Sequence, residues 1–195
     1  LKLAAGLLGR SQALVADAVH SLSDFATDFA VLVGLRLSSK PRDDDHAYGH
    51  GKYETIVAAI IGLALAGVAL EIASLSIHRI FDALRGEPLP PPAVYAFWAA
   101  LTSIVLKEAL FRATMTVSRA TGSPSLAANA WHHRSDALSS IATAAGVGAA
   151  SLLGREWGIL DPVAALFVSL FLLQVAWRIL RRHVGELTDR SLEPA

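Results

Sequence analysis

Two short segments of this 195-residue chain repeat the same arrangement of a histidine and an aspartate. His20 and Asp24 are four residues apart in HSLSD, and His132 and Asp136 have the same spacing in HHRSD. On a helix, residues four apart lie on one face, with Cβ atoms about 5–6 Å apart. Two such faces brought together would offer two imidazole nitrogens and two carboxylate oxygens, a donor set for a tetrahedral divalent metal ion.

The donor types narrow the choice of metal. Nitrogen and oxygen donors without thiolate suit zinc, and they also accept cobalt, iron, manganese or cadmium. The chain contains no cysteine, so a thiolate site and a disulfide framework are both excluded. One His–Asp pair alone could equally be a satisfied buried hydrogen bond, but the repetition favours metal binding. His133 could replace His132 by pairing with Asp136 at i+3, so the choice between these two neighbours stays open.

Other ionisable residues lie in the same apolar segments, where a charge costs at least ~2.5 kcal/mol on insertion scales. Asp17 and Asp28 flank the first pair. Each could be a proton relay or a structural acid inside the bundle, and we favour the structural role. Glu71, Lys107 and Glu108 are expected to be partners between helices or at the membrane interface.

A third cluster lies in the polar segment DDDHAYGHGK, from Asp43 to Lys52. A run of charged residues is usually a solvated loop. His46 and His50 are nevertheless four residues apart beside three aspartates, in a segment punctuated by glycines. We therefore expect metal contact here, either at a second, more exposed site or in a funnel that concentrates cations electrostatically.

The composition indicates an integral membrane protein. Hydrophobic residues make up 53% and charged residues 17% of the chain, and the formal net charge is zero. Soluble domains carry about 25% charged residues, so this chain has too few charged residues for an ordinary soluble enzyme. Disordered chains are polar and highly charged, and nucleic-acid binders are basic, so both of these classes are excluded.

Apolar segments predict the helices that must position the histidines and aspartates. The opening LKLAAGLLG is too short to cross a membrane and lacks the basic start and cleavage site of a signal peptide, so we interpret it as the end of a helix whose beginning is missing. The expected fold is an all-α, six-helix transmembrane bundle with the first helix truncated. The five fuller segments run from about Ser11 to Leu37, Tyr53 to Ile80, Pro91 to Val117, Ser125 to Leu153 and Asp161 to Leu180.

Basic residues predict the orientation of this bundle. Because Lys and Arg are enriched in cytoplasmic loops, we expect the segment 40–52 and the C-terminal end to be cytoplasmic, in the inner (plasma) membrane of a bacterium. On that side lie Lys40, Arg42, Lys52, Arg112, Arg119, Arg178, Arg181, Arg182 and Arg190, and on the other Arg10, Arg79, Arg85 and Arg155.

The order of these motifs resembles the cation diffusion facilitator family. HSLSD in an early span, DDDHxYGHGKxE in the next cytoplasmic loop and HxxSD in the fifth span together carry the likeness, which covers essentially the whole chain. The resemblance implies a dimeric divalent-metal/proton antiporter with six spans and a cytosolic, metallochaperone-like C-terminal domain. It implies a transmembrane domain over residues 1–183, followed by a linker over 184–195.

The resemblance also implies roles for particular residues. His20, Asp24, His132 and Asp136 match the family's central transport site. Asp43, His46 and His50 match the family's loop site. Lys52 and Asp189 match the family's charge interlock near the dimer interface. A histidine at position 20 is typical of the zinc-preferring branch.

We therefore expect a zinc exporter that works by alternating access and inward proton movement, and not an enzyme. Its expected partners are the metal ion, protons, the lipid bilayer and a second copy of the chain, without nucleic acid. A rival class is an intramembrane hydrolase using Ser125 of GSPS, but turns collect such residues by default and the zinc-protease motif HExxH is absent. A non-transporting membrane metal sensor remains a further alternative.

Overall fold

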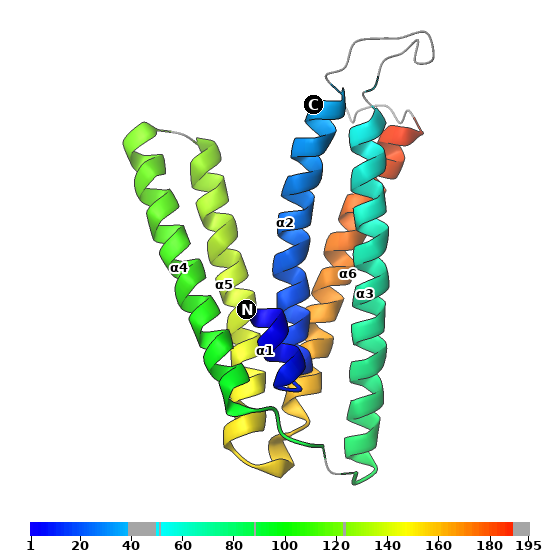
Figure 1. Ribbon diagram of the computed structural model, residues 1–195, viewed down its shortest axis with the longest axis vertical. Coiled ribbons are helices and arrows are strands. Elements are labelled where there is room, and N and C mark those ends of the chain that lie inside the picture. The colour runs from blue at the N-terminus through cyan, green and yellow to red at the C-terminus, as the bar shows by residue number, and fades with distance from the viewer. Residues whose placement is uncertain (39–49, 51, 88, 123, 189–195) are drawn as a thin grey trace. The chain divides into compact units, whose positions relative to one another are not determined.

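The computed structural model describes residues 1–38, 50, 52–87, 89–122 and 124–188, and the regular elements among them are all helices, with no strand (Figure 1). Inside the helices, the side chains of residues 27–35, 37–38, 54, 124–129, 132, 135, 138–139 and 155 lie outside the description. The elements in chain order are α1 (Lys2–Leu8), α2 (Gln12–Ser38), α3 (Lys52–Leu84), α4 (Val94–Thr121), α5 (Pro124–Leu152), the short 3₁₀ turn η1 (Arg155–Trp157) and α6 (Leu160–Leu187). The predicted all-α fold is confirmed.

The helices match the predicted segments closely, except at the end of α6. That helix continues to Leu187, well beyond the predicted end at Leu180. The added turns are polar and carry their own pairing: Arg182 Nε lies 3.2 Å from Glu186 Oε1, and His183 Nδ1 lies 3.0 Å from Glu186 Oε2. Pairs at i+3 and i+4 support a helix after its apolar stretch has ended.

Three helices in the described part of the chain are long and apolar enough to cross a membrane. They run over Thr55–Leu84, Val94–Thr121 and Leu160–Leu187, and Ser140–Leu152 is a shorter apolar helix. Each of the three is 28 residues or longer, and about 20 residues suffice for a bilayer. Together with the apolar composition, they identify an integral membrane protein.

The chain forms two compact units, which are described one at a time. The first consists of Leu1–Val19 and Ile72–Ser169. It therefore holds α1, the start of α2, the end of α3, α4, α5 and the start of α6. The second consists of His20–Glu71 and Leu170–Ala195.

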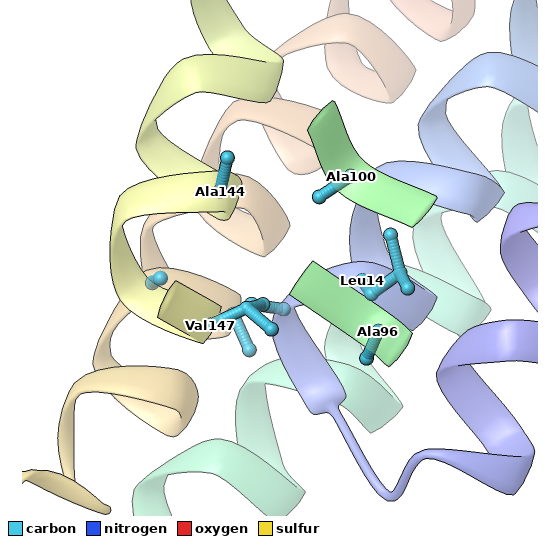
Figure 2. Close-up of a cluster of buried hydrophobic side chains, with 8 residues drawn as sticks. Leu14, Ala96, Ala100, Ala144 and Val147 are labelled. Atoms are coloured by element: carbon cyan, nitrogen blue, oxygen red, sulfur yellow. The ribbon is translucent and has the colours of Figure 1, made fainter. Parts of the chain in front are cut away.

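Small side chains form the core of the first unit. Figure 2 shows Leu14 of α2, Ala96 and Ala100 of α4, and Ala144 and Val147 of α5, which belong to one cluster of buried side chains. Alanine at these positions lets helix backbones approach closely, which favours helix packing in lipid. α4 and α5 pack extensively on each other, and they run side by side in Figure 1.

The start of α2 is fixed to the start of α6 by Asp161, also within the first unit. The Ser11 hydroxyl donates to Asp161 Oδ1 at 2.6 Å, and the Gln12 backbone N–H donates to Asp161 Oδ2 at 2.7 Å. Ser11 Oγ also accepts the Leu14 N–H at 3.1 Å, which is the bond of an N-cap. One buried carboxylate thus satisfies hydrogen-bond donors at a helix start that is shielded from solvent.

In the second unit, α3 packs on α6 through Gly62. A Cβ at Gly62 would meet the side chains of Ile179 and Leu180 at 3.0–3.1 Å, so only glycine gives this approach without a shift of the neighbours. Nearer the helix ends, Thr55 Oγ1 lies 3.3 Å from Glu186 Oε2. These contacts hold the start of α3 beside the end of α6.

Candidate metal site

The first predicted ligand pair lies one turn apart on α2, in the second unit. The His20 side chain is 2% exposed, and its ring meets Phe171 of α6 edge-on, with centroids 5.3 Å apart and planes at 85°. Ser23 Oγ donates to the His20 carbonyl at 2.7 Å, and Asp24 is half-buried. An imidazole packed against an aromatic ring has little freedom to turn, which is the restraint that a ligand needs.

The second predicted pair lies on α5, in the first unit. Asp136 is 8% exposed, and His132 precedes it by one turn with its side chain outside the described residues. The neighbouring Arg134 guanidinium stacks over Phe111 of α4 at 4.7 Å from the ring centroid, so this turn of α5 is braced against α4. His133, the alternative ligand, is half-buried. The joining of the two pairs into one four-ligand site stays a prediction.

A buried ionic network lies beside Asp136 in the first unit. Asp17 of α2 is 1% exposed and accepts hydrogen bonds from Lys2 Nζ at 2.8 Å and Ser140 Oγ at 2.9 Å. Lys107 Nζ of α4 lies 3.9 Å from the same carboxylate. Two ammonium groups thus lie close enough to compensate the charge of Asp17.

Lys107 connects that network to the candidate ligand helix. Its Nζ donates to the backbone carbonyl of Asp136 at 3.1 Å and to Ser140 Oγ at 3.0 Å, both on α5. A charged donor bonded to a backbone carbonyl fixes the position of α5 along α4, and therefore also the backbone position of Asp136. The expectation that Lys107 is a partner between helices is borne out by these distances.

Of the predicted loop site, one residue is described and two are not. Asp43 and His46 lie outside the described residues. The His50 ring stacks on Tyr53 with centroids 5.5 Å apart and planes at 23°, and its carbonyl accepts the Tyr53 N–H at 3.1 Å. His50 is thereby placed at the start of α3, and the three-residue loop site stays a prediction.

The predicted charge interlock is described at one end only. Lys52 is exposed at the first position of α3, and Asp189 lies outside the described residues. Asp28 lies on α2 with its side chain outside the described residues, so its two possible roles also stay open.

The role of Lys2 is what the sequence reasoning missed. Lys2 stands in an opening segment that was interpreted only as a helix end, yet its Nζ lies 2.8 Å from Asp17 Oδ2. One signal was available, because a lysine and an aspartate in neighbouring apolar helices need partners at bilayer depth. The pairing itself depends on how α1 folds back on α2.

Comparison with known proteins identifies the family. Residues 1–188 match the cation efflux transmembrane domain. The chain is 36% identical over 193 residues to an uncharacterized transporter of Methanocaldococcus jannaschii, covering 98% of this chain and 65% of that protein. It is 34% identical over 194 residues to the manganese efflux system protein MneP of Bacillus subtilis, covering 97% and 63%. For metal tolerance protein C1 of Arabidopsis thaliana the identity is 35% over 199 residues, covering 96% and 41%.

The structure thus defines a class of protein, a helical membrane protein whose helices carry His–Asp pairs. The chain belongs to the cation efflux family, as the resemblance to cation diffusion facilitators predicted. That family consists of transporters and not of enzymes, so the hydrolase interpretation is set aside. The chain covers less than two thirds of the length of each relative named above.

Proposed function

We propose that this protein exports divalent metal cations from the cytoplasm, with zinc as the preferred cargo. The observation that carries the proposal is the repeated His–Asp pair on α2 and α5, with His20 and Asp136 both buried. Ionisable side chains within membrane helices are costly and mark ion pathways by default. Membership of the cation efflux family supports the same conclusion.

Zinc is proposed from the donor types. In the proposed site, His20 and His132 supply nitrogens while Asp24 and Asp136 supply oxygens, and four such ligands suit tetrahedral zinc. Manganese prefers harder, oxygen-rich ligands. One relative is named for manganese efflux, so the preference for zinc rests on the two histidines of the proposed site.

Proton antiport follows from the same donors. Metal binding requires neutral imidazole and ionised carboxylate, so loading displaces protons and reprotonation weakens the site. Histidine titrates near pH 6.5 when unperturbed, which is close to cellular pH. Protons moving inward would therefore favour release of the metal on the far side, after helix movements expose the four ligands to that side.

The loop residues are proposed to collect ions. Asp43, His46 and His50 would form a more exposed site or an entry funnel on the cytoplasmic side. Clustered acidic groups raise the local concentration of cations. The ions would then pass to the proposed central site.

We further propose that the protein works as a homodimer. Residues 1–183 would be its transmembrane domain, and residues 184–195 would lead to a cytosolic domain, as the family resemblance implies. An exposed ion pair such as Lys52 with Asp189 contributes only ~0.2–1 kcal/mol. The small-residue helix faces and the cytosolic domain would have to supply most of the association energy. The C-terminus would be cytoplasmic, in the inner membrane of a bacterium.

Zinc uptake into sealed proteoliposomes tests this function. The full-length protein is reconstituted with a zinc-sensitive dye inside the vesicles, and flux is measured with and without a proton gradient. Asp24→Asn and Asp136→Asn should abolish flux. The matched control is Glu156→Gln, an exposed carboxylate in η1 that should leave flux unchanged.

Histidine variants complete the test. His20→Ala should abolish flux, whereas His78→Ala, at an exposed histidine on α3, should not. Zinc flux that persists in the two aspartate variants would refute the four-ligand site. Zinc binding without any flux in the wild type would instead favour the membrane metal sensor.

A further inference from the structure

A cavity of about 250 Å³ lies within the first unit, away from the proposed ligands. It is lined by the end of α1, the first turn of α2 and the last third of α3. The Ala93 N–H donates to the Gly9 carbonyl at 2.9 Å, so the turn between α1 and α2 adjoins the connection between α3 and α4. The cavity therefore opens near helix ends, where a membrane protein meets lipid headgroups. Pockets for drug-sized ligands hold about 300–1,000 Å³, so this one fits a smaller group.

One buried side chain in the cavity wall has an amide group whose hydrogen bonds a ligand could supply. Gln12 is 8% exposed, and neither its Nε2 nor its Oε1 has a hydrogen-bond partner among the described residues. Its backbone N–H is already bonded to Asp161, so only the side-chain amide is left. A buried amide without partners is unfavourable, and a group offering both an acceptor and a donor would satisfy it.

The charges in the wall favour an anion. Arg10 and Arg79 both line the cavity, and no other lining residue is charged. Asp161 lies within electrostatic reach of Arg79, and its carboxylate oxygens accept hydrogen bonds from Ser11 and Gln12. Two guanidinium groups against one carboxylate leave a net positive charge. Guanidinium binds phosphate through paired hydrogen bonds.

Apolar side chains surround the same opening. Leu7 and Leu75 line the cavity and are 62% and 51% exposed, and Leu8 beside it is 75% exposed. In an integral membrane protein, such leucines face acyl chains. A phosphate attached to acyl chains would therefore match both the charge and the apolar rim, whereas free phosphate would match the charge alone.

We propose that this cavity binds the headgroup of an anionic phospholipid. The phosphate lies between Arg10 and Arg79 and accepts a hydrogen bond from Gln12 Nε2. Gln12 Oε1 accepts a hydrogen bond from a hydroxyl of a glycerol headgroup. The acyl chains lie along Leu7 and Leu75. This site is independent of the proposed metal ligands.

Lipid titration followed by native mass spectrometry tests the proposal. The full-length protein in detergent is titrated with phosphatidylglycerol or with phosphatidylcholine, whose phosphate is masked by a choline. We expect phosphatidylglycerol to bind about tenfold more tightly or better, since charge-assisted hydrogen bonds are the strong ones. Arg10→Gln, Arg79→Gln and Gln12→Leu should each remove most of this preference.

Arg85→Gln is the matched control, because it removes one positive charge just after α3 from a residue that does not line the cavity. It should keep the preference. Equal affinity for the two lipids, or an equal loss in Arg85→Gln and Arg10→Gln, would overturn the proposal. Displacement of phosphatidylglycerol by millimolar inorganic phosphate would also overturn it in favour of a free-anion site. Arg10 is exposed, so its variant remains informative if Arg79→Gln fails to fold.

Discussion

Replacing Lys107 by methionine should destabilise the protein strongly, although methionine is apolar and of similar length. The Lys107 side chain is 12% exposed and lies 3.9 Å from Asp17, whose side chain is 1% exposed. The substitution also removes its hydrogen bonds to the Asp136 carbonyl and to Ser140. Removing one partner of a buried ion pair costs about 3–5 kcal/mol.

The expected loss is smaller than that limit because Asp17 keeps two partners. Lys2 Nζ remains at 2.8 Å and Ser140 Oγ at 2.9 Å, so we expect a loss of about 2–3 kcal/mol. For a chain of this size, that loss corresponds to a fall in the melting temperature of about 5–10 °C. Thermal unfolding of the purified protein in one detergent, at one lipid content, measures it.

Arg112→Met on the same helix is the matched control. Its Nε lies 2.8 Å from Glu108 Oε1, but the Arg112 side chain is 76% exposed, so its loss should cost only about 0.3–0.5 kcal/mol. A melting temperature that falls no further in Lys107→Met than in Arg112→Met would refute the reasoning.

Three further predictions concern the proposed transport function. His20→Asp replaces a nitrogen donor by a harder oxygen donor, so flux measured across a panel of metals should shift from zinc toward cadmium or manganese. Unchanged relative rates would count against a role for position 20 in metal selectivity. Changing Asp43, His46 and His50 together to Ala should slow transport or weaken apparent affinity without abolishing flux; complete loss in a folded protein would make the loop site obligatory. Zinc added to the protein in weak buffer should release protons, because metal and protons compete for the same atoms. A His20→Ala, Asp24→Asn variant should release fewer protons, and the zinc affinity of the wild type should fall as the pH is lowered. Equal proton release in both proteins would end the antiport argument.

The sequence alone determined the class of protein and the helices. Apolar segments of helix length can cross a bilayer only as helices unless they close into a barrel, because every backbone polar group must be satisfied internally. The five fuller segments correspond to α2 through α6. The two His–Asp pairs were also readable directly, since a spacing of four places residues on one helical face whatever the helix packs against.

Only the tertiary structure decided which buried charges meet. The sequence left Asp17 open between a proton relay and a structural acid, and its partners are Lys2, 15 positions away, and Ser140, 123 positions away. Such pairings depend on the packing of several helices, which local periodicity does not encode. The same holds for Gln12, whose place in a cavity wall follows from the approach of α1 and α3 to the start of α2. Spacing along one helix is a local property, whereas a partner on another helix is chosen by packing.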